Sequence, residues 1–393
     1  MVAVGKAAAP MATALLEMRD LDVVRTLAIG THASDRLPTS VEWIASSHPY
    51  PDARSERAGR RALGFAADVP DGDTLVLLLS GGASALMAAP IDGISLDDKI
   101  HTTRVMMSAG ANIHALNTVR RHLSRVKGGR LAATCRGAVV TLALSDVIGD
   151  DLSAIGSGPG VYDPSTWRDA AAALERWGGE LSHRPTVIAE VRRGVAGVIP
   201  EGPTPEDLDV TRVRAKVIGG RLDAMEGARA AAAARGYQPI VIHDPVQGEA
   251  RESAPVWLAR VATLIASSAR PTCVISTGET TVRVTGPGVG GRNLEFALAL
   301  AVALELQGGA IAAASVGTDG IDGSSGVAGG MVDSTTMSRA KALGLGTPQH
   351  YLDANDSFAF FEPMGDAVRL GRTDTNVGDL QVLLVDPRHP RDN

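Results

Sequence analysis

The stretch VRVTGPGVGGRNLEFALALAVALELQGGAIAAASVGTDGIDG, residues 282–323, decides the fold because it joins two expected strands through a glycine loop and a helix. The β-branched run over residues 280–285 predicts a buried strand, which breaks at a loop holding four glycines. From Asn293 onward apolar residues recur at helical spacing, and residues 311–316 predict the next strand. Such alternation continues along the chain and predicts an α/β fold with largely parallel sheets.

The glycine loop ends in Gly290, Gly291 and Arg292, where the helix is expected to begin. The unpaired N–H groups and the positive dipole end of a helix favour an anion at this position. A guanidinium can hold phosphate or carboxylate through two parallel hydrogen bonds. The sequence therefore predicts that these three residues bind a compact anion.

The same loop satisfies a second pattern, because Gly286, Gly288 and Gly291 match the G-x-G-x-x-G of dinucleotide-binding turns. That pattern also requires an acidic residue at the end of the next strand, about 20 residues further on. The nearest candidate, Asp319, follows Gly291 by 28 residues and lies in another glycine turn. The spacing favours phosphate or carboxylate and leaves NAD as the alternative.

Two aspartates are candidate metal ligands. Asp319 belongs to the turn over residues 317–323, whose carboxylates suit Mg²⁺. Asp146 follows an apolar strand expected over residues 137–144. Ligands of open α/β sheets bind at the carboxyl ends of strands, so Asp146 is a candidate for metal or substrate, with capping as its alternative role.

The first half of the chain contains two more turns suited to anions. Gly5 and Lys6 separate a short expected strand from a helix, which places the Lys6 ammonium near a natural phosphate position. A buried strand expected over residues 74–79 ends in a turn whose N–H groups and hydroxyls can bind an oxyanion. This turn does not match G-x-S-x-G, which disfavours a serine hydrolase. Its candidate residues are Ser80, Gly81, Gly82 and Ser84.

Residues 112–127 predict a helix with two stripes, one apolar and one polar. The polar stripe contains Asn117, Arg120, Ser124 and Lys127 and could line a cleft, although an ordinary solvent-exposed face fits equally well. Only five of the 38 basic residues are lysines. A lysine beside glycine, as at Lys6 and Lys127, then suggests a site that needs a compact ammonium.

The composition is that of a globular protein with about two domains: 393 residues, 45% hydrophobic and 21% charged. A net charge of −6 and an aromatic content of 3% argue against nucleic acid binding. No apolar run reaches the length of a membrane span.

The proline-, glycine- and acid-rich run over residues 200–209 predicts a linker between domains at 1–203 and 204–393. Cys135 and Cys273 are expected to be buried and free, as in a reducing cytoplasm.

Stretches along nearly the whole sequence resemble the class II glycerate 2-kinase family, whose C-terminal part is called the MOFRL domain. Each stretch is common by itself, but together they are specific. They are Gly5-Lys6-Ala7-Ala8, Ser80-Gly81-Gly82-Ala83-Ser84, Asn117-Thr118-Val119-Arg120-Arg121-His122-Leu123-Ser124, Lys127-Gly128-Gly129, Ser145-Asp146-Val147-Ile148-Gly149-Asp150, Ser157-Gly158-Pro159, Gly278-Glu279-Thr280-Thr281, Gly290-Gly291-Arg292-Asn293 and Thr318-Asp319-Gly320.

The resemblance implies two α/β domains with Rossmann-like sheets flanked by helices and an active site in the cleft between them. It implies ATP- and Mg²⁺-dependent phosphorylation of D-glycerate at the 2-hydroxyl, in a cytoplasmic enzyme whose partners are glycerate and a nucleotide, with a homodimer as one conceivable assembly. We expect Lys6 and Arg292 to be catalytic and Asp146 and Asp319 to bind metal. The expected substrate- or phosphate-binding residues are Ser80, Gly81, Gly82, Ser84, Asn117, Arg120, Gly290 and Gly291.

Two departures from the family pattern leave alternatives open. A helical segment usually precedes the Gly-Lys turn, and this sequence lacks it. The family pattern Gly-Pro-Thr-Gly-Thr-Asn here contains Arg372 and Asp374 in place of Pro and Gly. The alternatives are an NAD(P)-dependent hydroxypyruvate reductase, a name that some relatives carry, and a non-catalytic glycerate-binding protein.

Overall fold

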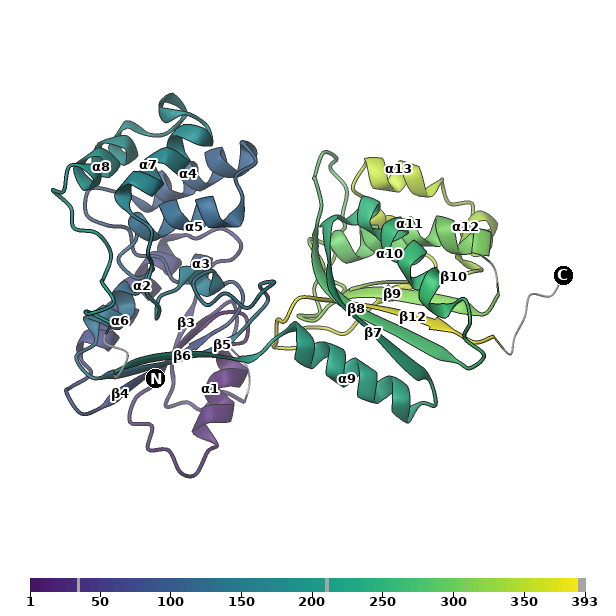
Figure 1. Cartoon of the computed structure of the whole chain (residues 1–393), viewed down its shortest axis with the longest axis horizontal. Coiled ribbons are helices and arrows are strands. Elements are labelled where there is room, and N and C mark those ends of the chain that lie inside the picture. The colour runs from purple at the N-terminus through teal and green to yellow at the C-terminus, as the bar shows by residue number, and fades with distance from the viewer. Residues whose placement is uncertain (34–35, 209–211, 308, 388–393) are drawn as a thin grey trace. The chain divides into compact units, whose positions relative to one another are not determined.

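The computed structural model describes residues 1–33, 36–208, 212–307 and 309–387. Two compact units, Met1–Ile218 and Gly219–Asn393, make up the chain. Each unit is built around a sheet of six strands flanked by helices, as Figure 1 shows. No helix within the described ranges is long and apolar enough to cross a membrane. The expectation of a two-domain α/β structure is confirmed.

The sheet of the first unit has the strand order β3-β2-β1-β4-β5-β6. The pairs from β3 through β5 are all parallel. This order is that of a Rossmann sheet, in which the chain runs outward from β1 on one side and from β4 on the other. The strands are β1 (Val2–Val4), β2 (Leu27–Gly30), β3 (Glu42–Ala45), β4 (Thr74–Leu79), β5 (Ala138–Leu144) and β6 (Val213–Gly219).

Helices cover both faces of this sheet, as the continuous apolar strands require. One core includes Phe65 of α2 and Leu131 of α6. The opposite face packs against Ala8 and Ala12 of α1. The helices nearest the sheet are α1 (Ala8–Leu16), α2 (Ala53–Ala67), α3 (Ala83–Leu86) and α6 (Arg130–Thr134), and the 3-10 helix η1 (Ile155–Ser157) lies against α3.

A second layer of helices in the first unit has a core of its own around Trp167. Figure 1 shows α4, α5, α7 and α8 stacked together on the far side of α3 from the sheet. Helix α4 begins where the Ser95 hydroxyl accepts the backbone N–H of Asp98, a capping box. The elements are α4 (Leu96–Ser108), α5 (Ile113–His122), α7 (Trp167–Arg176), η2 (Glu180–Ser182) and α8 (Pro185–Val195).

The sheet of the second unit has the order β11-β10-β9-β12-β8-β7. Among the strand pairs that the structure describes in this sheet, one, β7 with β8, is parallel. The other four pairs are antiparallel, so the expectation of largely parallel pairing holds in the first unit and is wrong in the second. The reason is β12, the last strand, which inserts between β8 and β9 and runs against both. The strands are β7 (Gln238–Glu249), β8 (Thr272–Thr281), β9 (Ile311–Gly317), β10 (Gly329–Asp333), β11 (Ala367–Val368) and β12 (Asp379–Val385).

Three layers form the second unit, with α9 on one face of the sheet and α10 and α11 on the other (Figure 1). Helix α11 is buried on nearly all sides, including Phe296 and Leu300, which agrees with its apolar sequence. The helices are α9 (Arg221–Ala234), α10 (Ala250–Ile265), α11 (Arg292–Gln307), α12 (Thr336–Ala342), α13 (Pro348–Asp353) and α14 (Ser357–Phe361).

The division between the units falls after Ile218, whereas the sequence placed it after residue 203. The expected linker packs on the first unit instead, because the Trp167 indole donates to the Pro200 carbonyl at 3.0 Å and the Trp167 backbone N–H donates to the Glu201 carboxylate. Strand β6 follows it and adds to the first sheet.

Two local expectations are also wrong. The strand expected to reach residue 285 ends at Thr281, because the Asn355 side chain takes the N–H groups of Thr285 and Gly286. The helix expected to reach residue 127 ends at His122, and Ser124 then forms a bridge with Pro90. The polar residues beyond His122 therefore do not continue one helical stripe.

Candidate active site

Two of the predicted anion-binding turns meet at the point where the first sheet reverses its strand order. Lys6 follows β1 and Ser80 follows β4, and these two strands are adjacent and parallel. The Lys6 backbone N–H donates to the Gly81 carbonyl at 2.9 Å. The Ser80 hydroxyl accepts the N–H of Ala7 at 3.0 Å. Ligands of open α/β sheets bind at such a reversal point, beyond the carboxyl ends of the strands.

Gly5 allows the two turns to approach this closely. A Cβ atom at Gly5 would lie 2.0 Å from the Ser80 hydroxyl oxygen, and its φ of +133° is unfavourable for other residues. Gly82 also has a positive φ, +86°, where the chain enters α3. The glycines therefore fix the Ser80 turn against the half-buried Lys6.

Asp146 lies at the same edge of the sheet. Strand β5 pairs with β4 in parallel, with Leu79 opposite Ala143, so the residues that follow both strands leave the sheet at one edge. Asp146 is half-buried, directly after Ser145. The structure thus places Lys6, the Ser80 turn and Asp146 along adjacent strand ends, as the sequence predicted.

Ser84 and Asn117 are held in a buried chain of hydrogen bonds. Lys127 Nζ donates to the Ser84 main-chain oxygen at 2.8 Å and to its hydroxyl at 3.0 Å. The Ser84 hydroxyl lies 3.0 Å from that of Ser157, which donates to Asn117 Oδ1 at 3.1 Å. These contacts make Asn117 a support for the turn. Lys127, singled out by its rarity and neighbouring glycines, belongs to the same chain of contacts.

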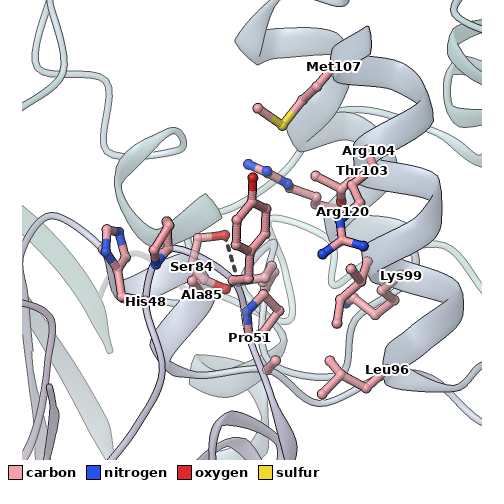
Figure 2. Close-up of a pocket in the computed structure, with 16 residues that line it drawn as sticks. His48, Pro51, Ser84, Ala85, Leu96, Lys99, Thr103, Arg104, Met107 and Arg120 are labelled. Atoms are coloured by element: carbon pink, nitrogen blue, oxygen red, sulfur yellow. Dashed lines mark hydrogen bonds between the residues drawn. The ribbon is translucent and has the colours of Figure 1, made fainter. Parts of the chain in front are cut away.

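A cavity of about 300 Å³ opens beside this turn. Figure 2 shows Lys99 and Arg104 extending into it from α4 and Arg120 from α5, with Ser84 on the opposite wall. The cavity is lined by His48, Pro49, Tyr50, Pro51, Gly82, Ser84, Ala85, Ala88, Leu96, Lys99, Ile100, Thr103, Arg104, Met107, Arg120 and Lys127.

Burial lowers the pKa of the two lysines that line the cavity. Burial, with lesser contributions from Arg120 and Arg130, lowers the pKa of Lys99 to about 7. Burial and the charges of Lys99, Arg120 and Arg121 lower the pKa of Lys127 well below its ordinary value. These lysines would regain their full charge next to an anion.

In the second unit, Arg292 is engaged by carboxylates of the chain itself. Its Nη2 donates to Asp379 Oδ1 at 3.0 Å, and its Nε lies 2.7 Å from Asp379 Oδ2. Its Nη1 donates to Glu279 Oε1 at 3.1 Å. Burial opposes the charge, but the two carboxylates together raise the pKa of Arg292 above its ordinary value. The Arg292 side chain as a whole is one-third exposed.

The start of α11 already holds an anion, the carboxylate of Asp322. The N–H of Asn293 donates to Asp322 Oδ1 at 3.0 Å and that of Leu294 to Oδ2 at 2.9 Å. Gly291 allows this approach, since a Cβ there would lie 2.4 Å from the Asp322 carboxyl carbon. The helix N-terminus expected to bind substrate is therefore capped internally, and Gly290 contacts Ser324 rather than an open site.

The remaining glycines of the G-x-G-x-x-G pattern are also occupied by the chain. A Cβ at Gly286 would lie 2.2 Å from the Ala354 carbonyl oxygen, and one at Gly288 would lie 2.4 Å from Asp356 Cβ. These glycines admit a neighbouring loop of the protein, where a dinucleotide site needs space for a pyrophosphate. The geometry speaks against NAD in this loop.

Asp319 lies in the turn after β9, where its Oδ1 accepts the N–H of Ile321 at 3.1 Å. The loop in which Arg372 and Asp374 differ from the family pattern packs on this turn. Its Thr373 N–H donates to the Asp319 carbonyl at 3.3 Å. Asp146 and Asp319 belong to different units. Within the described part of the chain, no group of three or more His, Cys, Asp or Glu side chains is placed to hold a metal.

Several residues of these sites carry little or no signal in the sequence. Lys99 could have been found from the scarcity of lysine, the signal that singled out Lys6 and Lys127. Arg104 and Tyr50 carried no signal of their own. Asp379 stands at the start of β12 and contacts Arg292 across 87 residues of sequence, which local pattern cannot reveal.

Comparisons with known proteins agree with this architecture. Residues 1–192 match a family described as a domain of unknown function, DUF4147, and residues 272–379 match the MOFRL family. The D-glycerate 2-kinase of Thermotoga maritima is 37% identical over 98% of this chain and 90% of that protein. A crystal structure of glycerate kinase from Thermotoga maritima superposes with a TM-score of 0.83, at 36% identity, over 98% of this chain and 90% of the other. An Agrobacterium vitis protein provisionally named hydroxypyruvate reductase is 38% identical over 98% of this chain and 86% of that protein.

Proposed function

Because this chain belongs to the class II glycerate 2-kinase family, we propose that it phosphorylates D-glycerate at the 2-hydroxyl, with ATP as donor and Mg²⁺ as the accompanying ion. The relatives named glycerate kinase cover nearly the whole chain. We also propose a cytoplasmic location, which the two free, buried cysteines support.

The observation that supports this function best is the meeting of Lys6 and the Ser80 turn at the reversal point of a Rossmann-ordered sheet. Phosphoryl transfer needs little covalent help from the protein, and depends on positioning and on neutralising the charge of the moving group. An ammonium beside N–H groups and hydroxyls can position the phosphoryl group and neutralise its charge.

We assign Lys6 to the transferring phosphoryl group or the glycerate carboxylate, and the Ser80 turn to orienting the same anion. As the 2-hydroxyl oxygen forms its bond to the terminal phosphorus of ATP, the bond from phosphorus to ADP breaks and the hydroxyl proton passes to solvent water. Arg292 is the second cation assigned to this reaction, with Asp379 and Glu279 fixing the plane of its guanidinium.

The carboxylates at the strand ends fit a magnesium ion brought by a nucleotide. Mg²⁺ binds through one or two carboxylates, substrate phosphates and several waters, so it does not require a protein cage. Asp146 of the first unit and Asp319 of the second, each half-buried in a loop after a strand, are the two residues we propose as metal ligands. When bound, the ion neutralises phosphate charge.

An assay coupled to ADP release tests this function, with D-glycerate, L-glycerate and other hydroxy acids as acceptors. We expect ADP release with D-glycerate that requires Mg²⁺, and phosphorus NMR that places the phosphate at carbon 2. NADH oxidation with hydroxypyruvate and no ADP release would support the reductase instead. Glycerate binding without either reaction would support a non-catalytic protein.

A further inference from the structure

The cavity beside the Ser80 turn collects positive charge without compensation. Four of its lining residues, Lys99, Arg104, Arg120 and Lys127, are cationic, and none of the lining residues is acidic. None of the four forms an ion pair with any carboxylate in the described ranges. Buried charges in proteins are normally paired, because an unpaired charge loses its hydration without return.

The Lys99 and Arg120 side chains leave most of their hydrogen-bond donors unused. The Arg120 side chain makes no hydrogen bond to the described part of the protein, although a guanidinium has five N–H donors. Lys99 Nζ donates once, to the Leu123 carbonyl at 2.8 Å. Figure 2 shows Lys99 and Arg120 facing the same space from adjacent helices. A ligand that accepts hydrogen bonds would take up the remaining donors of both side chains.

Mutual repulsion makes the cluster unfavourable without a ligand. Like charges within a few ångströms disfavour the charged form of each group. Burial and Arg120 lower the pKa of Lys99, and burial lowers that of Arg120. A helix layer that only needed to pack would gain stability from apolar residues at these positions. The arrangement therefore indicates a site that binds an anion.

The number of cations and the apolar part of the wall define the ligand. The glycerate carboxylate carries one negative charge, whereas a phosphate ester carries close to two at neutral pH. Leu96, Ile100 and Met107 give the cavity an apolar side, and the Arg104 guanidinium lies 5.1 Å from the Tyr50 ring centre. A bare inorganic ion would leave this side unused.

We propose that this cavity binds the phosphate end of a small organic phosphate, with Arg120, Lys99 and Lys127 on the phosphate oxygens, and that it does not bind the glycerate carboxylate. The inference rests on the proposed kinase function, which supplies two sources of this chemistry, the nucleotide and the phosphoglycerate product. Both sources present the same group to the cavity.

Calorimetric titration of the whole protein distinguishes the sources without any turnover. ADP, 2-phosphoglycerate and D-glycerate are titrated separately into wild type, Arg120→Gln and the control Arg125→Gln, whose exposed side chain lies outside the cavity. We expect Arg120→Gln to weaken ADP or 2-phosphoglycerate binding by about tenfold or more, since charge-assisted hydrogen bonds are lost, and to leave D-glycerate within about twofold. The phosphate ligand that is affected identifies the source.

Two results would overturn the proposal: equal affinities of wild type and Arg120→Gln for both phosphate ligands, or an equal loss for D-glycerate. Thermal unfolding without ligand gives a second criterion. Removing an uncompensated charge should leave the melting temperature of Arg120→Gln unchanged or higher, and a fall of several degrees would show a structural role instead. Because binding is measured directly, wild-type ADP binding without ADP-producing turnover would refute the kinase function and leave the cavity assignment standing.

Discussion

The guanidinium of Arg292 contacts both carboxylate oxygens of Asp379, at 3.0 Å and 2.7 Å, although the two residues are 87 positions apart in the sequence. Asp379 is fully buried at the start of β12. The Asn293 side chain donates to the same carboxylate at 3.0 Å. The end of the chain thus fixes the first turn of α11, and the position of Arg292 depends on β12 entering the middle of the sheet.

Replacing the buried partner of Arg292 should destabilise the second unit strongly. We expect Asp379→Asn to lower the free energy of unfolding by about 3 kcal/mol, because breaking this buried ion pair leaves the Arg292 guanidinium with the partly exposed Glu279 carboxylate. The control Asp244→Asn removes an exposed pair with Arg260 and should cost less than about 1 kcal/mol. Urea unfolding measures both, and equal effects would contradict the structural role of Asp379.

Gly5 should not tolerate a side chain. Gly5→Ala introduces a Cβ 2.0 Å from the Ser80 hydroxyl at a φ of +133°, so we expect a loss of about 2 kcal/mol or more in unfolding free energy. Gly64→Ala is the matched control, since no atom lies within 4 Å of its Cβ position in α2. It should stabilise by about 0.5–1 kcal/mol. Retained stability in Gly5→Ala would show that the Ser80 turn can move away from Lys6.

The Asp322 cap should make stability depend on pH in a definite direction. Burial raises the pKa of Asp322 to about 6, despite the N–H groups of Leu294 and Asn293. The folded state therefore holds this proton at higher pH than the unfolded state. The stability contributed by protonation is present below about pH 4 and is lost as pH rises through 6.

Asp322→Asn removes this titration. The unfolding free energy of wild type minus that of Asp322→Asn should fall by on the order of 2 kcal/mol between pH 4 and pH 7. Urea unfolding at several pH values measures the difference for both proteins. A difference that stays constant or rises with pH would contradict the account of this carboxylate.

Phosphate binding in the cavity should weaken with rising pH. The pKa of Lys99 is lowered to about 7, chiefly by burial and then by Arg120 and Arg130, so this lysine loses its proton above pH 7 in the free protein. A bound phosphate needs the ammonium form. We expect the Kd for the phosphate ligand that depends on Arg120 to rise by up to about tenfold per unit between pH 7 and pH 9.

Lys99→Met keeps the aliphatic stem and removes one titrating group, so its Kd should be higher than that of wild type at pH 7 and should rise less steeply across this range. Lys127 faces the same cavity, and burial and the neighbouring cations lower its pKa well below the ordinary value, so it accounts for any slope that remains in Lys99→Met. An equal pH slope in wild type and Lys99→Met would assign the dependence to another group.

The approach of Lys6 to Ser80 could be predicted from the sequence, because parallel strands expose their carboxyl ends at one edge. The apolar run before each turn identified those strands. Asp146 was predictable for the same reason. These inferences needed only local pattern and the common rule of Rossmann sheets.

The contacts of the second unit could not be predicted in this way. The glycine loop does precede a helix, but whether its N–H groups meet a ligand or Asp322 depends on a turn 28 residues away that folds back. The insertion of β12 between β8 and β9 reverses the expected pairing, and nothing in an isolated strand sequence encodes its neighbours. The cavity required Lys99 and Arg120 from two helices, whose facing sides follow from packing.

The most direct test of the central claim compares kcat/KM for ADP release with D-glycerate in Lys6→Met and in Lys216→Met, a control on the exposed side of β6. If phosphoryl transfer takes place at the reversal point of the first sheet, Lys6→Met should lose on the order of 10²-fold or more in kcat/KM, while Lys216→Met stays within about twofold of wild type. Near-normal turnover by a folded Lys6→Met protein would contradict the claim.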